Sequence, residues 1–301
     1  MKKFVIYMMS VTLVMTIVIV ANGKTVHTEP ESKQMAVTND ISGEFILYMT
    51  GSGTITIDWG DGTEIKTYSL LPLDDYHWQR GIVQNYAFSH TYSNDSERIV
   101  KISGENITHL KLGSRIIGLD VSKNPVLTWL NCGGARQLTK LDVSNNPALE
   151  VLLCHNNQLT SLDVSNNPRL ISLVCAGNKL TSLDLRNNLM LEILYCGDNE
   201  LFSLDLDKNA ALKVLDCSDN KISKLDLSKN IVLEVLVSKN NQLDSLDMNE
   251  LFRTLRTNFG EVRSVSVHGN PGTDTCIPTI ASNKGWDVKI DTSHEFMTTR
   301  Q

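Results

Sequence analysis

The sequence lacks several features that would assign it to a common functional class. It has no excess of basic residues, because 28 Lys and Arg stand against 34 Asp and Glu, for a net charge of −6. A phosphate backbone is repelled by such a protein, so we expect no nucleic-acid partner. Its 6 cysteines are too few and too widely spaced for a disulfide scaffold, and no Cys-x-x-Cys pair suggests a zinc site. Apart from one run at the N-terminus, the sequence has no apolar segment long enough for a membrane span.

Catalytic motifs are missing as well. The 7 histidines are scattered, and the sequence contains no His-Glu-x-x-His, Gly-x-Ser-x-Gly, phosphate-loop or dinucleotide-binding pattern. We therefore expect a protein that is not an enzyme and that carries no cofactor and no metal.

Residues 1–23 have the pattern of a secretory signal peptide. Two lysines precede an apolar run over 4–20, and Ala21 and Gly23 place small residues before a cleavage point at Lys24. An uncleaved membrane anchor is the alternative, since an apolar run of this length can span a bilayer. In either case we expect an exported protein that is secreted, periplasmic or held at the cell surface. Cleavage would remove both lysines and no acidic residue, which lowers the net charge from −6 to −8.

A repeat of 21 residues organises most of the chain. The dipeptide Leu-Asp recurs with one step of 22 residues followed by steps of 21, at Leu119, Leu141, Leu162, Leu183, Leu204, Leu225 and Leu246. Around it stands the pattern Leu-x-x-Leu-x-Cys-x-x-Asn-x-Leu-x-x-Leu-Asp-(Leu/Val). This pattern resembles that of the leucine-rich repeat family, and the resemblance covers residues 107–250 without a gap. It implies a solenoid of stacked coils, which we expect, with degenerate end coils, over residues 105–271.

The repeat places two further residue types beside the leucines. No single coil can bury its own leucines, so the coils stack and the leucines form inner columns. We expect a ladder of structural asparagines that satisfies backbone groups at the turns, at Asn157, Asn178, Asn199, Asn220 and Asn241. We also expect reduced, buried thiols in five consecutive coils, at Cys132, Cys154, Cys175, Cys196 and Cys217. Disulfides between neighbouring coils are an alternative, because stacked strands bring Cα atoms within disulfide range, and a metal site is a weaker one.

Alternate residues of each cysteine-bearing segment are expected to point outward. One outward column runs through His109, Trp129, Val151, Ser172, Ile193, Val214 and Val235, and the next through Lys111, Asn131, Leu153, Val174, Tyr195, Asp216 and Val237. Contiguous exposed apolar patches mark interaction sites. The candidate ligand-binding residues are therefore Trp129, Val151, Leu153, Val174, Ile193, Tyr195, Val214, Asp216 and Val237. The alternatives are that the N-terminal segment covers these columns, or that their β-branched residues serve strand formation alone.

The Leu-Asp side of the coils is polar. We expect a short strand or extended segment there too, with a stacked column of aspartates at Asp120, Asp142, Asp163, Asp184, Asp205, Asp226 and Asp247. Carboxylates about 5 Å apart repel by roughly 0.8 kcal/mol even in bulk water. We therefore expect a solvated column relieved by hydrogen bonds, with calcium binding as the alternative.

Residues 41–104 form a separate module before the repeats. They alternate in a way that predicts strands over 44–49, 54–59 and 99–103. The motifs Asp58-Trp59-Gly60-Asp61-Gly62-Thr63 and Ser89-His90-Thr91-Tyr92 look like those of the polycystic-kidney-disease (PKD) type of immunoglobulin-like β-sandwich. This resemblance implies a small sandwich that caps the solenoid, with residues 69–84 departing from the family as an inserted loop. Asp58 and Asp61 are read as parts of a structural turn, with a cation site as the alternative.

The two ends of the chain give simpler signals. Residues 24–40 are polar, so we expect a flexible lead-in. Residues 272–301 are expected to form a C-terminal cap and tail. Within them the sequence predicts a short helix over 277–283 and a last strand over 286–290, whose Trp286 would cover the final leucines.

The sequence thus predicts a mainly β protein, in which a small PKD-like sandwich is fused to a leucine-rich repeat solenoid with little helix. Its plan resembles that of exported bacterial leucine-rich repeat proteins of the internalin type, which implies binding of a protein or peptide, from a host or from a cell surface. Carbohydrate recognition is the alternative, because the sandwich family occurs on polysaccharide-degrading enzymes, and Trp129 and Tyr195 could stack on sugar rings. A purely structural spacer is the third reading.

Overall fold

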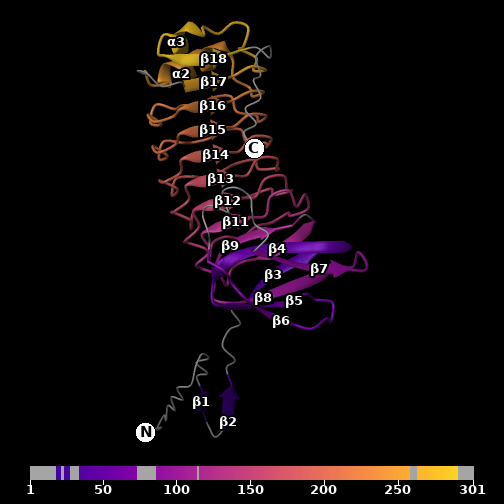
Figure 1. The fold of residues 1–301 in the computed structure, drawn as a ribbon. Helices are drawn as coiled ribbons and strands as arrows, with labels where there is room; N and C mark the ends of the chain where they lie inside the picture. Colours follow the sequence, from indigo (N-terminus) through magenta and orange to yellow (C-terminus); the bar gives the residue numbers. More distant parts are fainter. Residues whose placement is uncertain are drawn as a thin grey trace, which may run out of the picture.

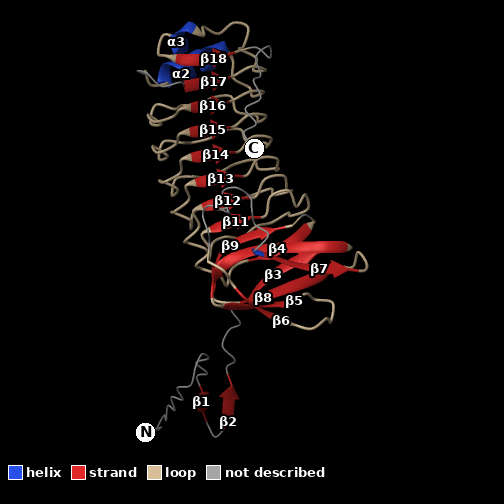
Figure 2. Ribbon diagram, viewed as in Figure 1, coloured by secondary structure: helices blue, strands red, loops and turns tan. Residues whose placement is uncertain are grey.

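The structure, a computed structural model, describes residues 18–21, 24–27, 34–72, 86–113, 115–257 and 263–290. Figure 1 shows a stack of coils that rises from a small N-terminal module. Strands and loops make up most of both parts, and the labelled helices lie at the C-terminal end of the stack (Figure 2). The prediction of a mainly β protein with little helix is confirmed.

One sheet of eleven strands runs along the whole stack, in the order β18-β17-β16-β15-β14-β13-β12-β11-β9-β4-β7. From β9 to β18 its neighbours pair in parallel, and β4 pairs antiparallel with β9. The solenoid strands are β9 (Asn106–Leu112), β11 (Trp129–Asn131), β12 (Val151–Leu153), β13 (Ser172–Val174), β14 (Ile193–Tyr195), β15 (Val214–Asp216), β16 (Val235–Val237), β17 (Arg263–Ser266) and β18 (Trp286–Lys289).

The 21-residue period places identical positions side by side in neighbouring coils. Leu173 pairs with Leu194, and Leu194 with Leu215, and all three side chains have no exposed surface. The five ladder cysteines are buried to the same extent. Because each coil completes the core of its neighbour, a continuous hydrophobic column replaces the separate core that a coil of this length cannot form. The predicted solenoid of about 21-residue coils is confirmed.

The predicted asparagine ladder has the expected role. The side-chain amide of Asn178 donates to the carbonyl oxygens of Cys154 and Cys175, at 3.1 and 2.9 Å, and its Oδ1 accepts from the backbone N–H of Leu159 at 3.0 Å. Asn199 and Asn220 repeat these bonds one and two coils further on. The ladder therefore joins each coil to the next at the turn that follows the strand.

A second asparagine ladder was missed by the sequence reasoning. Asn167 donates to the carbonyl oxygens of Val143 and Asn146, both at 2.9 Å, at the turn that precedes the strand. The buried members of this ladder are Asn124, Asn146, Asn167, Asn188, Asn209 and Asn230. The signal was present, because these residues also recur every 21 residues after the first step of 22.

Of the two forms expected on the Leu-Asp side, a short strand or an extended segment, the strand is absent from most of the described coils. In the described part of the chain this side forms a strand only in the first coil, where β10 (Ile116–Asp120) pairs with the N-terminal module. In later coils the aspartate bonds the backbone two residues ahead, as Asp163 does with the N–H of Ser165 at 2.9 Å. Such an Asx turn bends the chain, so it ends the extended segment that the alternation predicted.

The N-terminal module contains a second sheet, of five strands in the order β10-β3-β8-β5-β6. Besides β10, the module contributes β3 (Gln34–Asn39), β4 (Gly43–Ser52), β5 (Thr54–Asp58), β6 (Lys66–Ser69), β7 (Ala87–Tyr92) and β8 (Arg98–Ser103). The predicted strands over 44–49, 54–59 and 99–103 therefore form. Buried side chains of both sheets, such as Phe45 and Leu47 of β4 and Ile57 of β5, belong to one core with the solenoid leucines.

The expected flexible lead-in over 24–40 is wrong at its end, because Gln34–Asn39 is strand β3. It pairs with β8 and β10, and its Met35 and Val37 are buried in the core. The segment is polar overall, but buried and less buried residues alternate along it, which is the pattern of a strand. A separate two-stranded sheet joins β1 (Val18–Ala21) to β2 (Lys24–His27). Most of the proposed signal peptide, and most of the proposed insertion over 69–84, lie outside the described residues.

The C-terminal end differs from the prediction in one helix. The last Leu-Asp pair lies in α2 (Ser245–Thr254), where the Leu246 side chain is 75% exposed instead of buried in a coil. Asp244 caps this helix by accepting from the N–H groups of Leu246 and Asp247. The predicted short helix and last strand are present as α3 (Thr279–Ser282) and β18. Trp286 is buried there, and its indole N–H donates to the carbonyl oxygen of Arg256 at 2.9 Å.

Candidate ligand-binding face

The two outward columns on the strand side are in register from β9 to β16. Trp129 pairs with Val151, and the same column continues through Ser172, Ile193, Val214 and Val235. The second column runs from Lys111 through Asn131, Leu153, Val174, Tyr195 and Asp216 to Val237. We call these two columns the ligand face. All nine candidate residues lie in it, as their alternation predicted.

Most side chains of the ligand face are half-buried, because neighbouring strands shield one another. Tyr195 is the most open of the large apolar residues, with 39% of its surface exposed. Its neighbours across the strands are Val174 and Asp216. The face therefore presents a shallow aliphatic surface with one projecting aromatic ring.

Polar or aromatic groups interrupt the aliphatic part of the ligand face in two places. At the N-terminal end the rings of His109 and Trp129 stack with their centres 6.3 Å apart. Towards the C-terminal end Asp216 accepts hydrogen bonds from the N–H and hydroxyl of Ser218, at 3.0 and 2.5 Å. Along the rim Lys213 and Glu192 form an ion pair at 2.7 Å.

The described part of the lead-in does not lie over the ligand face. Strand β3 is in the five-stranded sheet, and β2 pairs only with β1. The alternative in which residues 24–40 cover the apolar columns therefore fails for β3 and β2.

The opposite side of the coils has a different electrostatic character. Hydrogen bonds from Ser165 lower the pKa of Asp163, and the charges of Asp184 and Asp142 raise it by less. Hydrogen bonds from Arg186, followed by its charge, lower the pKa of Asp184 to about 2. Asp163 and Asp184 are therefore stabilised as carboxylates by local donors, as expected for a solvated, hydrogen-bonded position.

Burial makes the ladder thiols unreactive. Desolvation raises the pKa of Cys132, Cys175 and Cys217 to about 12, and raises that of Cys154 and Cys196 well above the ordinary value. Thiolates are the nucleophilic and metal-binding form of cysteine, so these side chains behave as small apolar groups near neutral pH. Their predicted burial is confirmed, and their redox state stays a prediction.

The contacts of Asp58 and Asp61 give no support to a cation site there. Asp61 accepts from the Thr63 hydroxyl at 2.6 Å and lies 2.7 Å from Nε2 of His90, and these contacts, with the Thr63 bond foremost, lower its pKa to about 2. Asp58 accepts from the N–H of Gly60 at 2.9 Å. Within the described ranges no three His, Cys, Asp or Glu side chains are grouped as metal ligands.

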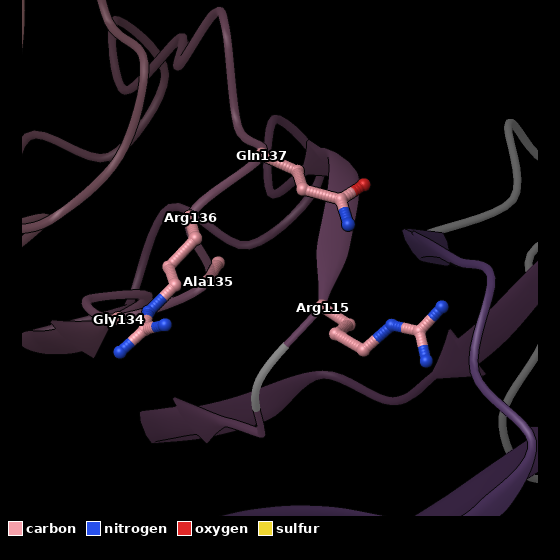
Figure 3. A pocket seen from close by; sticks show the side chains of 5 residues that line it. All are labelled: Arg115, Gly134, Ala135, Arg136 and Gln137. Carbon is pink, nitrogen blue, oxygen red and sulfur yellow. The ribbon is translucent and has the colours of Figure 1, made fainter.

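A cavity of about 570 Å³ lies beside the ligand face, where the first coil meets the N-terminal module. It is lined by Arg115, which follows β9, and by Gly134, Ala135, Arg136 and Gln137, which follow β11. Figure 3 shows the side chains of Arg115 and Arg136 on two sides of this space, with Gln137 turned towards Arg115. The sequence reasoning did not single out any of these residues.

Comparison with known proteins identifies the fold. No family model matches the chain, and no curated protein matches it. Among solved structures, the functional domain of InlJ from Listeria monocytogenes, described as including a cysteine ladder, is 34% identical, with a TM-score of 0.50. The match covers 58% of this chain and 36% of the InlJ chain. The present chain thus spans only about a third of that relative, and it has a cysteine ladder of its own.

Two further matches are more distant. An internalin, InlF, from Listeria monocytogenes is 24% identical, with a TM-score of 0.46, over 58% of this chain and 57% of that one. A leucine-rich repeat protein from Leptospira interrogans is 20% identical, with a TM-score of 0.47, over 56% and 44%. The likeness to the InlJ domain, together with the coils of about 21 residues, supports a solenoid of the leucine-rich repeat type. No helix among the described residues has the length and apolar character needed to cross a bilayer.

Proposed function

We propose that the chain is an exported, non-enzymatic binding protein that recognises a protein or peptide through the ligand face. The observation that carries this proposal is the register of two mostly aliphatic outward columns over β11 to β16. Strand pairing turns residues 21 positions apart into one continuous surface. A contiguous apolar surface on a soluble protein is a recurrent mark of an interaction site.

The solenoid does not need these residues for its own stability. Its inner leucine and cysteine columns already provide the core, and the opposite side of the same coils carries Ser, Asp and Arg instead. Stability therefore does not explain why one side of the coils is apolar and the other polar, and we infer that the apolar side binds a ligand. Aromatic side chains near the centre of an interface commonly dominate its binding energy, which assigns Tyr195 the leading part.

Carbohydrate recognition is the second candidate, and Trp129 and Tyr195 are the residues that favour it. A sugar site also needs polar groups around its aromatic rings to bind hydroxyls. Tyr195 has one polar cross-strand neighbour, Asp216, but its other neighbour is Val174, and the adjacent column beside it is formed by Ile193 and Val214. The aliphatic surroundings therefore favour a polypeptide.

Export is supported by the basic, apolar and small-residue order of residues 1–23. We infer a secreted, periplasmic or cell-surface location, with membrane attachment only through an uncleaved anchor. The PKD-like assignment of residues 41–104 is likewise inferred from the Asp58–Thr63 and Ser89–Tyr92 motifs. In this account the domains are the signal peptide (1–23), the lead-in (24–40, whose residues 34–39 are strand β3 of the module's sheet), the PKD-like module (41–104), the solenoid (105–271) and the cap (272–301).

Protein and glycan binding can be separated by running one pull-down and one array on the same protein. The exported protein is used to capture surface or host proteins, and in parallel is applied to a glycan array. A captured protein that is lost with a Tyr195→Ala, Leu153→Ala double variant, but kept with an Asp163→Ala, Asp184→Ala variant, supports the proposal. Glycan binding that depends on Tyr195 in the absence of a protein ligand overturns it in favour of the second candidate.

A further inference from the structure

The surface that contains the ligand face does not stop at the first coil. Strand β9 pairs in parallel with β11 on one side and antiparallel with β4 of the module on the other. In this register Lys111 lies between Asn131 of β11 and Tyr48 of β4. The second outward column therefore continues from the solenoid onto the N-terminal module.

A lysine and a tyrosine form this continuation. The amino group of Lys111 lies 5.2 Å from the centre of the Tyr48 ring, which is a cation–π distance. Among the described residues no carboxylate lies within ion-pair distance of Lys111. The Tyr48 ring thus positions the Lys111 amino group, and no neighbouring carboxylate of the described chain neutralises its charge.

Arg136 is a second basic residue, and a one-residue insertion in the first coil determines its position. The backbone N–H of Arg136 bonds the Asn156 carbonyl, as that of the ladder residue Asn157 bonds the Gly177 carbonyl one coil later. Arg136 therefore holds the ladder position. The extra residue, Ala135, is buried in the core, and the Arg136 side chain is exposed.

The backbone of Arg136 has the conformation of a solenoid turn. Its φ is +65°, and similar left-handed values recur in the turns of later coils, at Asn156, Asp198, Asp219 and Asn240. The side chain forms no ion pair within the described part of the chain.

A third basic residue, Arg115, follows β9, but it already has acidic partners. Its guanidinium donates to the carbonyl oxygen of Asp40 at 3.1 Å and lies 3.5 and 3.6 Å from the carboxylates of Asp40 and Asp95. It therefore forms a wall of the cavity, and Lys111 and Arg136 are the cations left to meet a ligand. Lys111 lies near the carboxyl end of β9, and Arg136 lies in the turn that follows the carboxyl end of β11, so both belong to the same edge of the sheet.

We propose that the ligand surface extends onto the module, and that Tyr48, Lys111 and Arg136 form a basic edge that receives acidic side chains of the protein ligand. This inference rests on the proposed function. Guanidinium matches a carboxylate in shape and hydrogen bonding, and lysine adds a mobile point charge. The middle of the face is aliphatic, and beyond Asp216 the face ends in Val235 and Val237. The surface therefore fits an extended polypeptide with aliphatic residues in its middle and acidic residues at the end that lies over Lys111.

Selection from a random 12-residue peptide library displayed on phage tests this inference and requires no identified ligand. The exported protein should enrich peptides that combine aliphatic and acidic residues. A Lys111→Gln, Arg136→Gln variant should keep the aliphatic preference and lose the acidic one. Selected peptides, made synthetically, should bind this variant about tenfold more weakly, and the difference should shrink as salt is raised.

The matched control is a Lys101→Gln, Arg169→Gln variant, which removes the same charge from exposed positions on β8 and on a solenoid turn. It should select the same peptides as the unaltered protein. Aliphatic peptides with no acidic preference, or an acidic preference that survives in the Lys111→Gln, Arg136→Gln variant, would overturn the basic edge alone. Failure to enrich any peptide, with a positive glycan array, would overturn the proposed function and this inference together.

Discussion

The side-chain amide of Asn178 donates a hydrogen bond of 3.1 Å to the carbonyl oxygen of Cys154, in the preceding coil. The same amide also bonds the Cys175 carbonyl of its own coil, so one buried side chain ties two coils and two cysteine positions together. A structure that is stabilised by nearest-neighbour contacts depends on such links, because each coil contacts only the coils beside it.

Asn178→Ala should therefore lower the free energy of unfolding by about 2 kcal/mol, since it leaves the buried N–H of Leu159 without its partner and removes one of the two amide donors from each of the Cys154 and Cys175 carbonyls. Urea unfolding followed by circular dichroism measures this loss. Asn166→Ala, at an exposed turn position of the previous coil, should change stability by less than about 0.5 kcal/mol. Equal effects of the two changes would show that the ladder is not a stabilising element.

The ladder cysteines should be reduced and slow to react. Native protein should take up a thiol reagent slowly near neutral pH, because desolvation raises the pKa of Cys175 to about 12, and should take up at least five equivalents after unfolding. Cys175→Ser should cost about 1 to 3 kcal/mol, since a buried hydroxyl there gains no assured partner. Two or more disulfides found by non-reducing mass spectrometry would contradict this account.

Acid should destabilise the solenoid through its aspartates. The pKa values of Asp142, Asp163 and Asp226 are lowered in the folded state, chiefly by hydrogen bonds from the serine two residues ahead, while unfolding restores their ordinary values. Their contribution to stability is therefore complete above about pH 4, and is lost as pH falls through the folded-state pKa values.

Urea unfolding at a series of pH values between 7 and 2 measures this dependence. Asp163→Asn keeps an oxygen for the Ser165 N–H but removes the ionisation, so its stability should fall less steeply with acid than that of the unaltered protein. A steeper fall in the variant would mean that repulsion within the aspartate column outweighs the hydrogen bonds.

Export should be accompanied by cleavage before Lys24. N-terminal sequencing of the exported protein should begin at that residue, because Ala21 and Gly23 supply the small residues that signal peptidase requires. An intact Met1 in a membrane fraction would instead identify residues 1–23 as an anchor.

The sequence predicts the repeated part of the structure well and its long-range contacts poorly. The 21-residue period alone assigns Cys175 and Leu173 to the core and Val174 and Ser172 to the outside, because every coil repeats the same local choice. The capped helix α2 breaks the period at Leu246, where Asp244 and the apolar spacing of Met248, Leu251 and Phe252 outweigh the Leu-Asp match.

The ends of the sheet depend on pairings that no local pattern encodes. Tyr48 meets Lys111 only because β4 folds back antiparallel on β9, across more than sixty residues of sequence. Likewise Arg136 reaches the surface because a one-residue insertion changes the backbone register of the first coil. Tyr48 and Arg136 of the basic edge were therefore accessible only from the structure, whereas Lys111 and the nine candidate residues of the ligand face followed from alternation.

The most direct test of the ligand face is the dissociation constant of the captured protein for three versions of this chain, measured by calorimetry. Tyr195→Ala should raise it at least about tenfold, as loss of a central aromatic contact usually does. Phe202→Ala removes an aromatic ring that is 57% exposed in the same coil but outside the ligand face, and should leave it unchanged. An unchanged constant for Tyr195→Ala, together with a large rise for Phe202→Ala, would place the binding surface on the other side of the solenoid.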